Sequence, residues 1–214
     1  MNVVFVTPDE PDEKRLIGLA EEALEGGVDA VQLRRKEASA RELFPLAKII
    51  REIADRVGAA LFVNDRADVA LAAGAAGVHL AGHSLPVAAA RAVLPPPLKV
   101  GVSCHGVAEA IQAQTEGADY VFLGTIFPSP SKADAKPVGL EELSRARREV
   151  TIPIIAIGGI TLENVGAVLS AGADGVAVIS AIAAQRSPRE AAETLVDAIE
   201  SWKGEKRPTI EVSE

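Results

Sequence analysis

A short glycine-led motif recurs four times along the chain at nearly even spacing. Gly27-Val-Asp-Ala-Val31 returns, with changes, at residues 74–78, 117–121 and 172–176, so its glycines stand 47, 43 and 55 residues apart. Each interval has room for two strand–helix units, and each glycine follows a helical stretch, where a left-handed cap is needed. Four such double units predict an α/β fold, a single-domain (β/α)₈ TIM barrel.

Short apolar runs mark the expected strands. They are nearly continuous rather than alternating, as parallel strands covered on both faces require. The runs are Val3–Val6, Ala30–Leu33, Ala60–Val63, Val78–Leu80, Val100–Val102, Tyr120–Leu123, Ile154–Ile157 and Val176–Ile179. Helical stretches separate them, such as Glu13–Glu25, Ala40–Val57, Val87–Val93, Val107–Glu116, Leu140–Arg148, Leu162–Ser170 and Pro188–Trp202. An open doubly wound sheet is the alternative, but it does not demand an evenly repeated motif.

Length and charge limit the class of protein. The 214 residues fit one domain, which we expect to span residues 1–203, with a flexible tail at 204–214 that lacks helical periodicity. A net charge of −8 argues against a nucleic-acid partner. The sequence has no apolar run of membrane-spanning length and no basic start typical of a signal peptide, so we expect a cytoplasmic protein. The single cysteine, Cys104, excludes an internal disulfide and is expected to be a packing residue.

Two loops near the end of the chain favour a phosphate site. Barrel active sites lie at the C-terminal ends of the strands, and phosphate often binds after strands seven and eight. Gly158-Gly159 lets backbone N–H groups approach an anion, and Val178-Ile179-Ser180 opens the last helical segment beside it. The alternative is that the glycines are only turn residues.

A second group of residues is cationic. Arg34 and Lys36 follow the second expected strand, and the polar loop Pro128–Val138, a candidate lid or clamp, supplies Lys132 with the hydroxyls of Ser129 and Ser131. Arginine and lysine both bind phosphate oxygens, although a charge run can also be a solvated surface. Two anion sites in one barrel mouth suit two phosphorylated substrates.

Titratable residues at the strand ends leave several roles open. Asp65 is the only acid directly at a strand end, where it could hold Mg²⁺ with diphosphate oxygens, pair with Arg66 or cap the next helix. His79 lies within an apolar run and is expected in the core. His83 and His105 lie in loops with no acid partner evident in the sequence, so a catalytic triad is not predicted.

Seven stretches in order resemble the thiamine phosphate synthase/TenI family, from Val3 to about Trp202. The matching stretches are Val31-Gln-Leu-Arg-Arg-Lys36, Val63-Asn-Asp-Arg-Ala-Asp68, Gly77-Val-His-Leu80, Gly101-Val-Ser-Cys-His105, Gly124-Thr-Ile-Phe-Pro-Ser-Pro-Ser-Lys132, Ile154-Ile-Ala-Ile-Gly-Gly-Ile160 and Gly172-Ala-Asp-Gly-Val-Ala-Val-Ile-Ser180. The resemblance implies a (β/α)₈ barrel and, for the synthase branch, an enzyme that joins hydroxymethylpyrimidine diphosphate to thiazole phosphate and releases diphosphate.

The resemblance also implies roles for individual residues. It assigns the pyrimidine diphosphate to Gln32, Arg34, Lys36, Asn64, Ser103, Ser131 and Lys132, Mg²⁺ to Asp65, and the thiazole phosphate to Gly159, Ile179 and Ser180. Arg34, Lys36 and Lys132 would be catalytic, because they would stabilise the departing diphosphate.

Two positions depart from the family patterns. Ser84 stands where the synthase branch has the second aspartate ligand of the metal, which predicts weak Mg²⁺ binding. Thr125 stands where the TenI branch, a thiazole tautomerase, has its catalytic histidine. Because the diphosphate-binding residues of the synthase branch are retained, a synthase is the main expectation. A thiazole tautomerase and a catalytically silent thiazole phosphate binder are the alternatives. The sequence also leaves a homo-oligomer possible.

Overall fold

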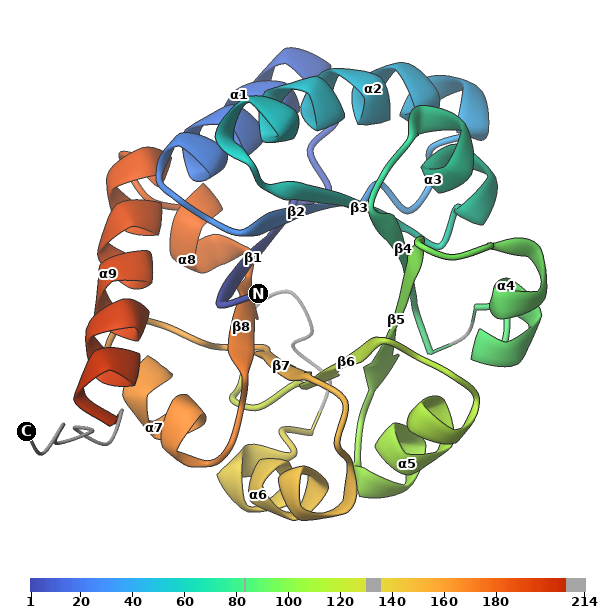
Figure 1. Cartoon of the computed structure of the whole chain (residues 1–214). Helices are drawn as coiled ribbons and strands as arrows, with labels where there is room; N and C mark the ends of the chain where they lie inside the picture. The colour runs from blue at the N-terminus through green and yellow to red at the C-terminus, as the bar shows by residue number, and fades with distance from the viewer. Residues whose placement is uncertain (83, 130–135, 207–214) are drawn as a thin grey trace, which may run out of the picture.

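Within residues 1–82, 84–129 and 136–206, which the computed structural model describes, eight parallel strands close into a barrel in chain order. The last strand pairs with the first, with Phe5 opposite Val178, so the sheet has no free edge. Helices form a layer outside the strands (Figure 1). The (β/α)₈ barrel predicted from the repeat is confirmed, and the open sheet is excluded.

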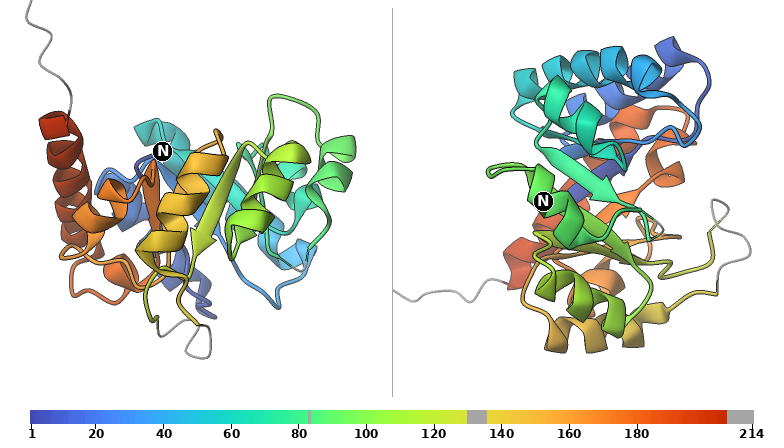
Figure 2. Two further views of the ribbon diagram at one scale, coloured as in Figure 1. Left: turned by 90° about the horizontal axis from the view of Figure 1, so that it is seen from below. Right: turned by 90° about the vertical axis from the view of Figure 1, so that its right-hand side faces the viewer.

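Strands and helices alternate as predicted. The strands are β1 (Val3–Val6), β2 (Ala30–Leu33), β3 (Ala60–Asn64), β4 (Gly77–Leu80), β5 (Lys99–Cys104), β6 (Tyr120–Gly124), β7 (Ile154–Ile157) and β8 (Gly175–Val178). The helices are α1 (Glu13–Glu25), α2 (Ala40–Val57), α3 (Ala67–Ala73), α4 (Val87–Val93), α5 (Val107–Thr115), α6 (Gly139–Glu149), α7 (Val165–Ser170), α8 (Ser180–Ala183) and α9 (Pro188–Lys206). In the side views the strand arrows end on one side of the molecule, and the N-terminus lies toward the other (Figure 2).

The repeated motif has one structural role at the N-terminal end of the barrel. Its four glycines all have positive φ angles, from 66° at Gly74 to 105° at Gly172, which favour glycine. In three copies the third residue is an aspartate whose carboxylate accepts a hydrogen bond from the first residues of the preceding strand. The pairs are Asp29 with Val3 N (2.8 Å), Asp119 with Val100 N (2.7 Å) and Asp174 with Ile154 N (2.8 Å). The remaining copy has Ala76 at this position.

The last helical part of the chain differs from the sequence expectation. Ser180 opens the short helix α8 and not the last helix. The helix predicted from Pro188 is confirmed as α9, which begins at this proline, a residue suited to the first turn of a helix. Helix α9 runs to Lys206, beyond Trp202, where the helical stretch was expected to end. Residues 207–214 lie outside the described part of the chain.

The barrel interior has its own apolar core, separate from the larger core between strands and helices. It consists of Val4, Val6, Ala30, Phe62, Tyr120, Phe122, Ile155 and Ala177. These side chains fill the barrel below its C-terminal end. Tyr120 brings a hydroxyl into this core, where it meets the buried His79.

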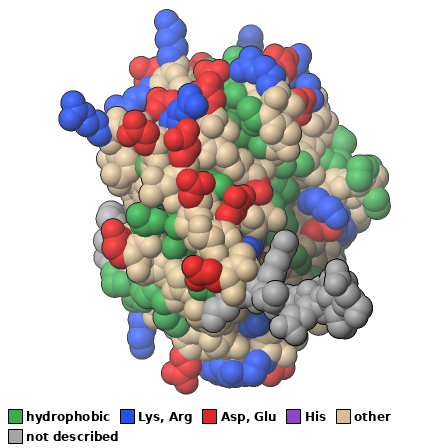
Figure 3. Space-filling view, turned by 60° about the vertical axis from the view of Figure 1, so that its left-hand side comes forward, with side chains coloured by type: hydrophobic (Ala, Val, Ile, Leu, Met, Phe, Trp, Pro, Cys, Tyr) green, Lys and Arg blue, Asp and Glu red, His purple; other side chains and the backbone are tan. Residues whose placement is uncertain are grey.

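Charged side chains cover much of the outer surface. On the face drawn in Figure 3, acidic and basic side chains are interspersed rather than gathered by sign. Several form exposed ion pairs such as Arg189 with Glu193 at 2.9 Å, a kind of pair that adds little stability. Over the described residues, every helix is too short or too polar to cross a membrane.

Candidate active site

A cavity of about 860 Å³ opens at the C-terminal ends of the strands. This volume is typical of small-molecule sites. Its apolar wall includes Phe122 and Ile157 from the barrel interior. Ten residues that the sequence analysis selected line the cavity: Gln32, Arg34, Lys36, Asn64, Asp65, Ser103, Ser129, Gly159, Ile179 and Ser180. The fold thus brings together residues that lie up to 148 positions apart in the sequence.

A chain of hydrogen bonds links the ends of β2 and β3. Gln32 Nε2 donates to Asn64 Oδ1 at 2.7 Å, and Asn64 Nδ2 donates to Asp65 Oδ2 at 2.7 Å. The Gln32 side chain is almost fully buried, and within the described residues its Oε1 atom has no hydrogen-bond partner. A buried unpaired acceptor is costly, so this oxygen is available to a donor on a ligand.

Asp65 is held in one orientation by its neighbours. Its Oδ1 accepts hydrogen bonds from the backbone N–H of Ala81 (2.7 Å) and from the Ser84 hydroxyl. Its φ of 59° is in the left-handed region, which aspartate tolerates better than most residues. Position 84 therefore faces Asp65, as the metal-ligand comparison predicted, but with a hydroxyl in place of a carboxylate. The alternative pairing with Arg66 is not formed, because Arg66 binds Asp68.

This donor set fits a magnesium ion that one carboxylate shares with a substrate. The described residues hold no group of three His, Cys, Asp or Glu side chains arranged to bind a metal. Mg²⁺ in proteins is often held by one or two carboxylates together with substrate phosphate oxygens. Asp65 is the carboxylate that would supply this, with the Ser84 hydroxyl beside it.

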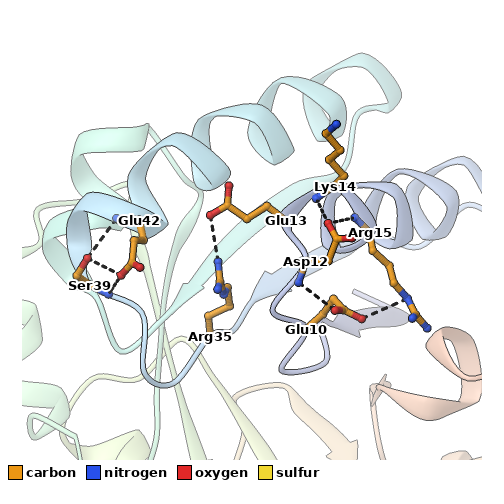
Figure 4. A network of polar contacts seen from close by, with 8 residues as sticks. All are labelled: Glu10, Asp12, Glu13, Lys14, Arg15, Arg35, Ser39 and Glu42. Carbon is orange, nitrogen blue, oxygen red and sulfur yellow. Dashed lines mark hydrogen bonds and ion pairs between the residues drawn. The ribbon is translucent and has the colours of Figure 1, made fainter.

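The cationic run after β2 divides into two parts. Arg35 also lines the cavity but pairs with Glu13 of α1, with 3.4 Å between Nη1 and Oε1 (Figure 4). Arg34 and Lys36 line the cavity, and neither pairs with a carboxylate among the described residues. The backbone of Arg34 is fixed by Thr7, whose fully buried hydroxyl accepts from Arg34 N at 2.9 Å. The charge of Arg34 is therefore left for a ligand.

The loops after β1 and β2 are held in place where they lead into helices α1 and α2, because side chains cap the first turn of each helix. Ser39 and Glu42 form a capping box at the start of α2 (Figure 4). Asp12 caps α1 by accepting from the backbone of Lys14 at 2.9 Å. Fixed loops hold binding groups in place before a ligand arrives, which lowers the entropic cost of binding.

The opposite side of the cavity is formed by Gly158-Gly159 and the start of α8. The two glycines have φ angles of 99° and 64°, and a Cβ at Gly159 would lie 2.5 Å from the Pro128 carbonyl oxygen. Asn164 fixes the turn by donating to the Gly159 carbonyl at 2.9 Å. The glycines are thus required by the turn itself, and the turn lies beside Ser180 in the cavity wall.

The histidines and the cysteine have different surroundings. His79 and Cys104 are buried, as expected, and burial raises the pKa of the Cys104 thiol to about 12. The expectation that His105 has no acid partner is wrong, because Glu109 lies one helical turn further on and its Oε2 is 3.2 Å from His105 Nδ1. That pair is exposed. Both residues also line the cavity.

Three predicted residues lie outside the described part of the chain: His83, Ser131 and Lys132. Two residues with a role in the site were missed. Thr7 and Tyr120 support cavity residues through buried hydroxyls. The sequence did contain a sign of each. Thr7 is a polar residue directly after the apolar run Val3–Val6, and Tyr120 begins an otherwise apolar strand.

Fold and cavity together define a (β/α)₈ barrel protein with a polar cavity at the C-terminal ends of its strands, lined by two cations that pair with no carboxylate among the described residues. The family model for thiamine monophosphate synthase matches residues 3–182. The chain therefore belongs to this family, as its motifs predicted.

Individual relatives agree over most of their length. A thiamine-phosphate synthase of Methanoculleus marisnigri is 50% identical, covering 88% of this chain and 90% of that protein. The thiamine-phosphate synthase of Chlorobium luteolum is 51% identical, covering 81% and 82%. The crystal structure of thiamine phosphate pyrophosphorylase from Pyrococcus furiosus superimposes with a TM-score of 0.86 at 38% identity, covering 94% of this chain and 96% of that one.

Proposed function

We propose that this protein is a thiamine phosphate synthase, a transferase that joins hydroxymethylpyrimidine diphosphate to thiazole phosphate and releases diphosphate. The observation that carries the proposal is the arrangement of the cavity. The Gln32–Asn64–Asp65 chain and the free charges of Arg34 and Lys36 lie in the same cavity as the Gly158-Gly159 turn. One cavity thus has groups for a diphosphate and for a monophosphate, as the reaction requires.

In this reaction the bond between the pyrimidine methylene carbon and the diphosphate oxygen breaks, and the thiazole nitrogen bonds to that carbon. Arg34 and Lys36, with Lys132, stabilise the negative charge that develops on the leaving diphosphate. Gln32 accepts a hydrogen bond from the substrate through its unpaired Oε1 atom. The apolar wall at Phe122 and Ile157 excludes water from the carbon that becomes electron-deficient.

The remaining contacts bind and orient the two substrates. Ser103, Ser129 and Ser131 donate hydroxyl hydrogen bonds to the diphosphate. Gly159, Ile179 and Ser180 hold the thiazole phosphate, which places the thiazole nitrogen within reach of the pyrimidine carbon. Mg²⁺ held at Asp65 supplies positive charge to the diphosphate oxygens when bound. Cytoplasmic location and assembly into a homo-oligomer stay predictions.

The names of the relatives favour the synthase over the tautomerase and the silent binder. The residue at the tautomerase histidine position, Thr125, is buried and has no group that titrates near neutral pH. A protein that acted only on a monophosphate would also have no use for the cations after β2.

The test supplies purified protein with Mg²⁺, the pyrimidine diphosphate and the thiazole phosphate, and measures thiamine phosphate by chromatography. A parallel sample receives the thiazole carboxylate phosphate tautomer and is followed by ultraviolet absorbance. We expect thiamine phosphate in the first sample and no isomerisation above background in the second. Isomerisation without coupling would contradict the synthase and favour the tautomerase, and inactivity in both samples would leave the binder.

A further inference from the structure

Three polar side chains form a line beneath the cavity, on neighbouring strands β4, β5 and β6. The Tyr120 hydroxyl lies 3.3 Å from His79 Nδ1, and His79 Nε2 lies 3.0 Å from Ser103 Oγ. Tyr120 is 3% and His79 1% exposed, while Ser103 is partly exposed and lines the cavity. The proposed reaction uses neither buried group directly. Polar groups buried in an apolar barrel are costly unless paired, so this line requires an explanation.

The surrounding residues hold the line in place. Gly101 lies opposite Tyr120 in the pairing of β5 with β6, and a Cβ at this position would overlap the tyrosine ring. The His79 ring packs against Phe122, with 4.0 Å between the ring centroids. The Tyr120 ring also meets Phe62 edge to face at 5.4 Å. The two buried rings therefore have little freedom to choose other partners.

The protons of the line can be assigned by counting donors and acceptors. Both side chains are almost fully buried among apolar rings, where a charged form is costly, so His79 is neutral and Tyr120 is protonated. Each of the three side chains then has one proton to donate. Among the described residues, His79 is the only hydrogen-bond partner of the Tyr120 hydroxyl.

Only one arrangement leaves no buried proton without an acceptor. If His79 carried its proton on Nδ1, that proton would point at the tyrosine oxygen, and the Tyr120 proton would have nowhere to go. If the proton is on Nε2, the Tyr120 O–H donates to Nδ1 and Nε2–H donates to Ser103 Oγ. The Ser103 proton is then turned away from His79, toward the cavity.

We propose that Tyr120 and His79 are positioning residues that fix the Ser103 hydroxyl as a hydrogen-bond donor toward the cavity. The proposal rests on the proposed function for the identity of the acceptor, which is an oxygen of the pyrimidine diphosphate. Ser103 is thereby prepared for an anion before the substrate binds. A ligand group that can only donate hydrogen bonds would face the O–H of Ser103, also a donor, and would therefore be disfavoured there.

The protonation of His79 can be measured without any substrate. The chain has three histidines, so the ring nitrogens of ¹⁵N-labelled protein give few signals, and the His79→Gln variant identifies those of His79. We expect His79 to carry its proton on Nε2 throughout the range from about pH 6 to about pH 8. A proton on Nδ1 would overturn the proposal. This result does not depend on whether the protein makes thiamine phosphate, so it separates failure of the proton line from failure of the proposed function.

Kinetics test the consequence for the substrate. Tyr120→Phe keeps the ring but removes the hydroxyl, so we expect kcat/KM for the pyrimidine diphosphate to fall roughly 3- to 20-fold, the range of one hydrogen bond, with KM for thiazole phosphate unchanged. In a Ser103→Ala background the same substitution should cause no further loss. Additive losses would contradict the proposal, since they would mean that Tyr120 acts independently of Ser103.

Variants of His79 add a rescue experiment. His79→Gln retains an amide N–H that can donate to Ser103, whereas His79→Leu retains none. We expect the glutamine variant to keep several-fold more kcat/KM than the leucine variant. Thermal denaturation of both identifies variants that fail to fold. Equal activity of two folded variants would show that packing, not hydrogen bonding, is what His79 contributes.

Discussion

The two ends of the barrel differ in how sequence relates to structure. At the N-terminal end the same device recurs, because an aspartate of the repeat accepts a hydrogen bond from the start of the preceding strand in three of four copies. At the C-terminal end the polar residues differ from strand to strand, as do Gln32 near the end of β2, Asn64 at the end of β3 and Ser103 near the end of β5. The comparison teaches that residues repeated around the barrel stabilise the fold, whereas residues that break the repeat form the site.

The largest expected effect is at the C-terminal end. Arg34→Ala removes a cation that pairs with no carboxylate among the described residues, so stability should change little. Loss of a charge-assisted contact to the leaving group costs about 2–4 kcal/mol in the transition state, a fall in rate of roughly 30- to 1,000-fold. Steady-state assays and urea unfolding of the same preparation measure both quantities. Arg15→Ala, which removes an exposed arginine paired with Glu10, is the matched control. A loss of stability without a fall in rate would contradict this prediction, since it would mean that Arg34 stabilises the fold and does not act on the leaving group.

The next effect concerns the N-terminal end. Asp119→Ala leaves the buried N–H of Val100 without its acceptor, so unfolding free energy should fall by about 1–3 kcal/mol while kcat at low temperature is kept. Asp55→Ala, which breaks an exposed pair with Arg51, should cost less than about 0.5 kcal/mol. Urea denaturation distinguishes them. Equal losses in the two variants would refute the structural role of the repeat aspartate.

A third effect tests position 84. Because Ser84 contacts Asp65, Ser84→Asp brings two carboxylates together. Without metal they repel, and with Mg²⁺ both can act as ligands, so we expect affinity for Mg²⁺ with diphosphate to rise about tenfold, worth about 1.4 kcal/mol. Calorimetry measures this. Asn at the same position, which adds no charge, is the control, and equal tightening by both would rule out a direct metal ligand.

The smallest effect completes the repeat. Ala76 is exposed and occupies the position that the other copies give to aspartate. Ala76→Asp should therefore add a hydrogen bond to the start of β3 and raise the unfolding free energy by about 0.5–1 kcal/mol. Ala76→Asn gives the uncharged comparison. A loss of stability in the aspartate variant would mean that a carboxylate at position 76 cannot reach the start of β3, which would contradict the prediction.

The barrel and its site also differ in how much of each could be predicted from the sequence. The repeat and the apolar runs predicted the barrel and most strand limits, because burial on both faces of a parallel strand leaves a local signal. The site residues at the strand ends were predicted from their places after those runs and from the family motifs. The extra turn at α8 and the length of α9 were not, since helix ends depend on tertiary contacts such as that of Lys203 with Asn2.

What the sequence could not reveal are contacts between distant strands. The unpaired oxygen of Gln32 depends on a side-chain orientation that no spacing determines. The pair of His105 with Glu109 is different, because it joins residues four positions apart, a spacing from which it could have been predicted. Tyr120 was read as part of an apolar strand, although its hydroxyl reaches His79 on another strand of the barrel. Such a residue fits the sequence pattern of its own strand, but its contact in the site is with a residue far away in the sequence.

The most direct test asks whether both substrates occupy the barrel mouth together. Protein saturated with Mg²⁺ and inorganic diphosphate is titrated with thiazole phosphate in a calorimeter, and the same titration is run without diphosphate. If the diphosphate lies at Arg34 and Lys36 and the monophosphate at Gly159, thiazole phosphate should bind one to one in both titrations, with a Kd that diphosphate does not weaken. Displacement of one ligand by the other would contradict a cavity that holds the two reacting partners side by side.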